Sequence, residues 1–475
     1  MDKFTGKDIM DLGYRPERWF GPALREIEER RLSRSQAIRF AHEAKAAWDA
    51  KQPKVMRLQD GVDFIVNMTP ENENERDNMD KVVSGFRELV RTPTIVAGAV
   101  MPDACPSEPG AIPVGGVVGA RNAIHPGMHS ADICCSMFLT VIDADPKDVL
   151  DAMASVTHFG PGGRRDGRFE MSPDLLRMFS ENPFMANGKI LNAARTHLGT
   201  QGDGNHFTYV GLNGQGKTVL VTHHGSRGVG ALLYKAGMKM AKDHTEKVSP
   251  ETSPKNAWLE ADSATGQAYW KALQLAREWT KENHRVLHDA ALAEMGLTAI
   301  DRLWNEHNFV FQDDDLFWHA KGATPIHNAF IPDTNGTQII PMNMAQPILL
   351  VQGERHDRNL GFAPHGAGRN MSRSQHKRSK GEATVEEIFR EETRGLDARF
   401  FSGKIDISEL PSAYKDADSV QRDMERFGLA RVVDRVQPYG CVMAGEQEPE
   451  PWLVAKMRAK QEKASAEAED EAPNP

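Results

Sequence analysis

The sequence of 475 residues contains only four cysteines, so disulfide bonds cannot form the framework of its fold. It also lacks any run of about 20 apolar residues, which excludes a membrane-spanning helix. The first residues have no apolar stretch of the kind found in a signal peptide. We therefore expect a cytoplasmic protein with reduced cysteines and no membrane partner.

An excess of positive charge is missing as well, because 58 Lys and Arg stand against 67 Asp and Glu. The net charge of −9 excludes a uniformly basic coat for nucleic acid. Residues 446–475 hold eight acidic and four basic residues, so nearly half of the net negative charge lies there. The rest of the chain is close to neutral and has room for local basic patches.

Histidine, in contrast, is abundant, with 17 residues, and this indicates a metal site or an acid–base site. Hydrophobic residues make up 40% of the chain, as in folded globular proteins. A chain of this length forms one large domain or two to three smaller ones.

Helical and strand-like patterns alternate along the chain, which predicts an α/β (α+β) fold with mixed sheets flanked by helices. We predict helices at residues 23–31, 35–51, 77–91, 146–154, 173–179 and 262–295. We predict strands at residues 63–68, 94–100, 114–120, 136–142, 218–222 and 348–351. The predicted organisation is a helical N-terminal extension (1–60), a catalytic domain (61–446) and an acidic tail without fixed structure (447–475).

The first segment with reactive side chains contains Asp132 and Cys135 in a turn between two predicted strands. A carboxylate and a thiolate three residues apart can reach one metal ion, and a thiolate can bridge two. The alternative is a buried structural cysteine, because cysteine is among the most buried residue types.

The second and third segments place histidines beside glycines. Residues 199–207 contain three glycines followed by Asn205 and His206, which suits either a ligand site or a solvated turn. Next, His223 and His224 end a predicted strand, and the Gly-Ser-Arg-Gly that contains Arg227 precedes a helix predicted to begin near residue 231. Adjacent strand residues point to opposite faces, so only one of these two histidines should face a metal.

The fourth segment reads Pro-His-Gly-Ala-Gly-Arg over residues 364–369, with His365 on a loop of small residues. An imidazole with open space beside a guanidinium is suited to covalent attack on a phosphate. Residues 369–380 carry five basic residues and no acid. This basic strip can follow a nucleic-acid backbone, or it can be a solvated helix.

Taken together, these motifs resemble the RtcB-type RNA-splicing ligases. The resemblance rests on Asp-Ile-x-Cys, Gly-x-Gly-Asn-His-Phe, His-x-Gly-Ser-Arg-Gly, His307-Asn308 ahead of Lys-Gly-Ala-Thr, His-Gly-Ala-Gly-Arg-x-Met-Ser-Arg and Ala-Tyr-Lys-Asp-Ala-Asp, in that order. It covers roughly residues 95 to 445 and implies a single large catalytic domain.

The resemblance implies an RNA ligase that uses manganese and GTP. Such enzymes join RNA ends with a 2′,3′-cyclic phosphate or 3′-phosphate to a 5′-hydroxyl through a histidine–GMP intermediate. His365 resembles the histidine that accepts GMP. The implied ligands of two Mn²⁺ ions, with the Cys135 thiolate shared, are Asp132, Cys135, His206, His223 and His307.

The resemblance also implies contacts to nucleotide and RNA. The nucleotide-binding set is Asn205, Asn343 in place of a usual serine, Gly366, Ala367, Gly368 and Tyr414, which resembles an aromatic residue that stacks on guanine. The RNA- or phosphate-binding set is Arg369, Arg373, Arg227, Arg164 and Arg165; a flexible loop is the alternative for the segment around the last two. Implied partners are broken RNA, such as tRNA or another structured RNA, and an activating protein of the archease type.

Three positions depart from the family pattern. Tyr209 stands where a glutamate reads the guanine edge, and the stretch around Met443 lacks the lysine that caps guanine. Cys105 replaces the histidine of Pro-Asp-Val-His. Losing a charged partner of a base edge forfeits on the order of 1–3 kcal/mol of discrimination. We therefore expect altered nucleotide selectivity; the alternatives are a metal-dependent cyclic-phosphate phosphoesterase and a non-catalytic RNA-binding protein.

Overall fold

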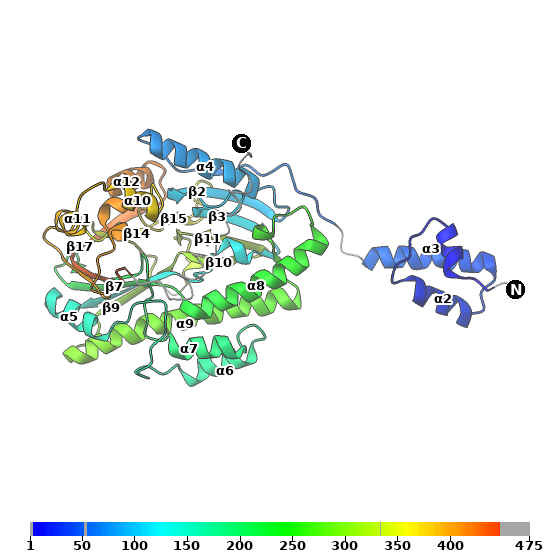
Figure 1. The fold of residues 1–475 in the computed structure, drawn as a ribbon, viewed down its shortest axis with the longest axis horizontal. Coiled ribbons are helices and arrows are strands. Elements are labelled where there is room, and N and C mark those ends of the chain that lie inside the picture. Colours follow the sequence, from blue (N-terminus) through cyan, green and yellow to red (C-terminus); the bar gives the residue numbers. More distant parts are fainter. Residues whose placement is uncertain (1–2, 52–54, 333, 447–475) are drawn as a thin grey trace, which may run out of the picture. The chain divides into compact units, whose positions relative to one another are not determined.

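The computed structural model describes residues 3–51, 55–332 and 334–446 (Figure 1). The chain divides into two compact units, residues 1–57 with 246–251 and residues 58–245 with 252–475. The first unit contains the helices α1 (Gly6–Asp11), α2 (Phe20–Glu29) and α3 (Arg34–Lys51). Its own small core is built around Ile9, Trp19 and Ala41. No helix in the described ranges is long and apolar enough to cross a membrane.

The second unit combines mixed sheets with surrounding helices (Figure 1). The helices are α4 (Glu73–Leu89), α5 (Pro146–Val156), α6 (Pro173–Glu181), α7 (Gly188–Thr196), α8 (Arg227–Val248), α9 (Ala264–Met295), α10 (Arg373–Ser379), α11 (Val385–Glu392) and α12 (Ala417–Arg426). Of these, α8 extends to Val248, so its last residues group with the first unit.

Two large sheets form the frame of this second unit. The five-stranded sheet has the order β1 (Ile65–Val66), β2 (Ile95–Cys105), β3 (Val114–Arg121), β11 (Leu316–Lys321), β10 (Asn308–Asp313). The second large sheet has the order β13 (Gln338–Ile340), β14 (Ile348–Gln352), β17 (Arg431–Met443), β6 (Phe207–Leu212), β7 (Thr218–His224), β5 (Ser136–Ile142), β9 (Asp301–Glu306). Strand β16 (Asp397–Phe400) lies outside this order and pairs with β17. Two small pairs are β12 (Ala323–Pro325) with β15 (Phe362–Pro364) and β4 (Ala123–Ile124) with β8 (Leu259–Glu260).

The central strands β5 and β7 are buried almost throughout because both of their faces are covered. One face packs on α5 and α9, where Leu220 meets Leu150 and Leu287 in one cluster. The other face forms a second cluster in which Leu139 and Val221 meet residues of β14 and β17. The ends of these strands are therefore held rigidly.

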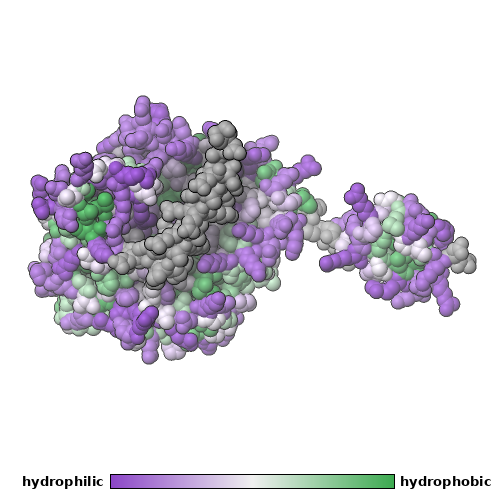
Figure 2. Space-filling model, viewed as in Figure 1, coloured by the Kyte–Doolittle hydropathy of each residue, from purple (hydrophilic) through white to green (hydrophobic). Residues whose placement is uncertain are grey.

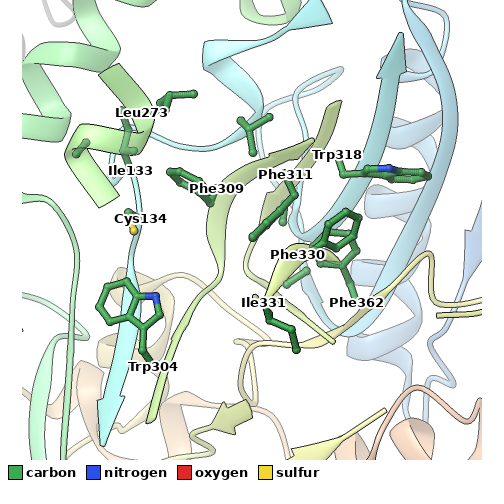
Figure 3. Packing of buried hydrophobic residues seen from close by; sticks show 14 of the residues in the cluster. Ile133, Cys134, Leu273, Trp304, Phe309, Phe311, Trp318, Phe330, Ile331 and Phe362 are labelled. Carbon is green, nitrogen blue, oxygen red and sulfur yellow. The ribbon is translucent and has the colours of Figure 1, made fainter. Parts of the chain in front are cut away.

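The largest hydrophobic core joins the two sheets to α8 and α9, and Figure 3 shows part of it. Phe309 and Phe311 of β10 lie at its centre, with Trp318 of β11 nearby. The side chain of Cys134 lies in this core, so this thiol serves packing. The side chain of the next residue, Cys135, lies outside this core.

The fold class predicted from the sequence, α/β with mixed sheets, is confirmed. The predicted strand at 136–142 coincides with β5, and the helix predicted at 262–295 is α9. Helix α8, however, begins at Arg227 and not near residue 231, because the Ser226 carbonyl already accepts a hydrogen bond from the Gly230 amide. The predicted tail, residues 447–475, lies outside the described residues, and the predicted domain boundaries stay predictions.

Candidate active site

One end of the β6–β7–β5–β9 sheet gathers the five predicted metal ligands. These strands pair antiparallel. The start of β6, the end of β7, the start of β5 and the end of β9 therefore lie at the same end of the sheet. His206 directly precedes β6, His223 is the second-last residue of β7, and His307 directly follows β9. Asp132 and Cys135 lie in the turn before β5. The strand order therefore brings together residues that are far apart in sequence.

The ligand atoms of these residues form two groups that share one sulfur. The first group is Asp132, Cys135 and His206, and the second is Cys135, His223 and His307; within each, all atoms lie within 4.8 Å of one another. Cys135 Sγ lies 3.6 Å from His206 Nε2 and 3.2 Å from His223 Nε2. This arrangement suits two ions with a bridging thiolate.

The orientation of the imidazoles is set by their second ring nitrogens. His206 Nδ1 lies 2.7 Å from the Gln201 carbonyl oxygen, and His223 Nδ1 lies 3.1 Å from the Asn205 carbonyl oxygen. Both Nδ1 atoms therefore carry a proton and donate it, which leaves Nε2 as the free electron-pair donor. The Nδ1 atom of His307 is buried without a hydrogen-bond partner among the described residues.

The electrostatics of the cluster fit a divalent cation. Burial lowers the pKa of His223 to about 3 and that of His307 well below its usual value, so both are neutral. Burial also raises the pKa of the Cys135 thiol well above its usual value. Burial acts in the same direction on Asp132, but the hydrogen bond with His206 and the neighbouring positive charges together outweigh it, and the pKa falls to about 2. A bound cation is what stabilises a thiolate in such a place.

Two residues at the end of β7 border the cluster, and neither supplies a ligand atom to it. A Cβ atom on Gly225 would lie 2.0 Å from Asp132 Oδ1, so only glycine leaves this carboxylate in place. The next residue back, His224, points to the opposite face of β7, as strand alternation predicts, and stacks on His284 of α9 with ring centroids 3.4 Å apart. The first group therefore depends on a glycine, and His224 is outside it.

The predicted nucleophile His365 lies beside the second group, with its ring centroid 5.0 Å from that of His307. A buried carboxylate holds it: Asp103 Oδ2 lies 2.5 Å from His365 Nδ1 and accepts the His365 backbone N–H at 3.0 Å. Because Nδ1 is engaged, Nε2 is the atom free to attack. Gly322 closes the other side, where a Cβ would lie 3.0 Å from the imidazole.

A cavity of about 920 Å³ joins His365 to the metal-type cluster. The predicted site residues on its wall include Asp132, Cys135, His223 and His307 of the cluster. All the predicted nucleotide-binding residues and two of the predicted phosphate-binding residues also line it: Asn205, Asn343, Gly366, Ala367, Gly368, Tyr414, Arg369 and Arg373.

Sequence reasoning missed Glu409, which organises the phosphate-binding part of this wall. Its carboxylate is buried and accepts hydrogen bonds from Arg369 at 2.6 Å, Arg373 at 2.8 Å and the Tyr414 hydroxyl at 2.6 Å. Arg369 also lies over the Tyr414 ring, 4.7 Å from its centroid. Two guanidiniums facing one carboxylate leave one positive charge for an anionic ligand.

Asp103 and Glu409 gave little signal in the sequence, since each acts on a partner that only the fold brings near. Asp103 lies 262 positions from His365 along the chain, and Glu409 lies 40 positions from Arg369. The one available sign was a carboxylate at the end of a strand-like run, in the segment that contains Cys105.

The other predicted RNA contacts lie outside the residues that line the cavity. Arg227 is half-buried, donates to the Gly160 carbonyl and carries its charge near Asp132. Arg164 donates to Asp166 and to two backbone carbonyls, and only 10% of its side chain is exposed. Arg165 is exposed. The fold thus uses Arg164 to hold its own loops together.

The basic strip at residues 369–380 is largely neutralised by acidic residues elsewhere in the chain. Besides the two arginines on Glu409, Lys377 pairs with Asp406 at 3.3 Å and Lys380 with Glu392 at 2.6 Å. Arg378 alone among the five has no ion pair within the described residues. The strip is therefore mostly an internal network, and its surface charge is small.

Two of the three positions that depart from the family pattern, Tyr209 and Met443, line one apolar part of the cavity. Tyr209 is buried, and its hydroxyl donates to the Val436 carbonyl at 2.8 Å, so its polar group is already satisfied. Met443 and Cys441 lie beside it on β17, and Met344 faces the same space. Cys105 lies elsewhere, with its sulfur 3.0 Å from the Arg369 amide nitrogen.

A sequence model of the family described as tRNA-splicing ligase RtcB matches residues 165–444, more than half of the chain. The chain belongs to the RtcB family. This confirms the resemblance drawn from the motifs, and the matched RtcB region contains three of the five predicted metal ligands together with His365.

Individual RtcB proteins are similar over much of the chain. The tRNA-splicing ligase RtcB of Aeropyrum pernix is 30% identical over 285 residues, which is 51% of this chain and 58% of that protein. The tRNA-splicing ligase RtcB of Archaeoglobus fulgidus is 25% identical and aligns over 73% of this chain and 87% of its own length. The RNA-splicing ligase RtcB of Escherichia coli is 26% identical, with 72% and 89% covered.

Proposed function

We propose that this RtcB protein is an RNA ligase that joins 2′,3′-cyclic phosphate or 3′-phosphate ends to 5′-hydroxyl ends through a nucleotide bound to His365. The observation that carries the proposal is the placement of an aligned, accessible imidazole in the same cavity as two ligand groups that share a thiolate. The similarity to RNA-splicing ligases supports it.

Asp132, Cys135, His206, His223 and His307 would hold two divalent cations, for which we propose Mn²⁺, although this donor set also accepts zinc or cobalt. When bound, such ions neutralise phosphate oxygens and polarise hydroxyl groups. The neutral imidazoles and the ionised carboxylate supply the protonation states that such binding requires.

His365 performs the covalent chemistry in this proposal. Its Nε2 attacks the α-phosphorus of GTP, a P–N bond forms and pyrophosphate leaves, while Asp103 retains the proton on Nδ1. Where the RNA ends in a 2′,3′-cyclic phosphate, water first attacks that phosphorus, the P–O2′ bond breaks, the 2′-oxygen takes a proton, and a 3′-phosphate results. An oxygen of the 3′-phosphate then attacks the phosphorus on His365 and releases the imidazole. The 5′-hydroxyl finally attacks the activated 3′-phosphorus, GMP leaves, and the hydroxyl proton passes to solvent. Arg369 and Arg373 neutralise the phosphate oxygens throughout.

The apolar part of the cavity supports altered nucleotide selectivity. The Tyr209 hydroxyl is engaged with the backbone, and Met443 and Met344 offer no hydrogen bonds to a base edge. A site without paired donors and acceptors discriminates weakly between purines. We therefore propose that ATP replaces GTP with less than about a tenfold loss of adduct formation.

The test is incubation of the protein with Mn²⁺ and labelled GTP or ATP, followed by detection of acid-labile, base-stable label on the protein. His365→Ala should abolish the label, whereas His356→Ala, whose ring contacts the Gly428 carbonyl, should keep it. Absence of any adduct despite bound metal would refute the ligase proposal. Conversion of a cyclic phosphate to a 3′-phosphate without nucleotide would then identify a phosphoesterase.

A further inference from the structure

One face of α4 lines the catalytic cavity although α4 lies outside the residues matched by the family. The lining residues occur at helical positions i, i+3, i+4 and i+7, which share one face: Asn74, Asp77, Asn78 and Lys81. A neighbouring face of the helix carries buried apolar residues that pack against β2 and β3. Figure 2 shows a hydrophilic surface over α4 at the top of the larger unit. We refer to the four residues as the α4 stripe.

The α4 stripe is part of a fixed wall, because the segments at both ends of α4 are tied to the rest of the unit. Before the helix, the Thr69 amide donates to Asp423 at 2.7 Å. After it, the Gln59 side chain donates to the Val90 carbonyl at 2.9 Å. Within the stripe, Asn78 donates to the Asn370 carbonyl at 2.5 Å, one residue from Arg369. A rigid wall beside the phosphate-binding arginines is preorganised for a ligand.

The chemistry of the α4 stripe differs from that of the cationic residues that line the same cavity. Arg369, Arg373 and Lys321 supply cations to the cavity, whereas the stripe contains two amides, one carboxylate and one ammonium and has no net charge. Neither Asp77 nor Lys81 forms an ion pair within the described residues. Anionic groups are therefore drawn to the arginine side, and the stripe suits an uncharged end with hydrogen-bonding groups.

An RNA strand that ends in a 5′-hydroxyl has this character, because its terminal nucleoside carries no phosphate at the end. Asparagine amides bind base edges and sugar hydroxyls, and a lysine can reach the first internucleotide phosphate. The side-chain oxygen of Asn370, buried without a partner in the described structure, adds another acceptor on this wall. We propose that the α4 stripe is the binding subsite for the RNA strand that carries the 5′-hydroxyl. This inference rests on the proposed function.

The test compares wild type with the double variant Asn74→Ala/Lys81→Ala; Asn78 is kept because it anchors Asn370. The variant should form the nucleotide adduct at the wild-type rate, while its KM for a short 5′-hydroxyl RNA rises roughly tenfold, as for the loss of one or two hydrogen bonds. The control Arg87→Ala, exposed on the same helix outside the cavity wall, should leave both values unchanged.

The outcomes separate the two proposals. A wild-type protein that forms no adduct refutes the proposed function itself. A wild type that ligates, together with a double variant of unchanged KM, refutes the subsite alone. A double variant that loses adduct formation also refutes the subsite, because the change would then act through the loop of His365. Fluorescence anisotropy with a labelled 5′-hydroxyl RNA should show the same weakening as the KM.

Discussion

Replacement of Asp103 by asparagine tests how the proposed nucleophile is aligned. The Asp103 carboxylate receives two hydrogen bonds from His365, one from the ring at 2.5 Å and one from the backbone at 3.0 Å. Asparagine keeps the size of the side chain but removes its charge. A charge-assisted hydrogen bond exceeds a neutral one by about 1–1.5 kcal/mol, so losing the charge from two costs about 2–3 kcal/mol. The rate of adduct formation should therefore fall roughly 30- to 150-fold.

The assay measures single-turnover labelling of the protein by GTP with metal in excess, and circular dichroism verifies that the variant is folded. Asp423→Asn is the matched control, because Asp423 is also buried and accepts a backbone N–H, from Thr69, but does not line the cavity. The control should label at the wild-type rate. If Asp103→Asn also labels within about threefold of wild type, the alignment argument is wrong.

Three further predictions concern the metal cluster and the core. Cys135→Ser should remove both ions, since its sulfur belongs to both ligand groups, whereas His206→Ala should remove one; metal content per chain after dialysis decides this, and equal losses would contradict a shared thiolate. Gly225→Ala should displace the Asp132 carboxylate and weaken metal binding at least tenfold by titration, with an unchanged melting temperature without metal. Burial lowers the pKa of His125 to about 4, so its contribution to stability is complete above pH 6.5 and is lost as pH falls towards 4. His125→Gln should therefore reduce the fall in unfolding free energy between pH 7 and 5, measured by urea denaturation, by about 2 kcal/mol, and an unchanged fall would contradict its burial in the neutral form.

Apolar runs predict the strands that are covered on both faces and give little sign of the others. β5 is such a run and is predicted with its exact bounds. β17 contains Arg431, Asp434 and Arg435 in its exposed half, so its sequence has the charge content of a loop. β9 begins with Asp301 and Arg302 for the same reason. Only pairing with β14 and β5 makes these segments strands.

The candidate site, too, can be predicted only in part from the sequence. Motifs identify side chains that supply ligand atoms, and strand order explains how they meet. Partners such as Glu409 are found only in the structure, because one carboxylate is chemically like another until the fold gives it neighbours. The histidine count also overstates the chemistry: His224, His284 and His288 lie in the core, where the last two bond to the Thr222 hydroxyl.

The loop before β6 holds one ligand of each group by its own backbone: the Gln201 carbonyl orients His206, and the Asn205 carbonyl orients His223. A displacement of this loop would therefore turn both rings together. Two ions bound by these groups would depend on the same loop as well as on the shared Cys135 sulfur, so the loss of one ion would affect the binding of the other. Metal loading should slow hydrogen exchange across residues 199–206 in a single step.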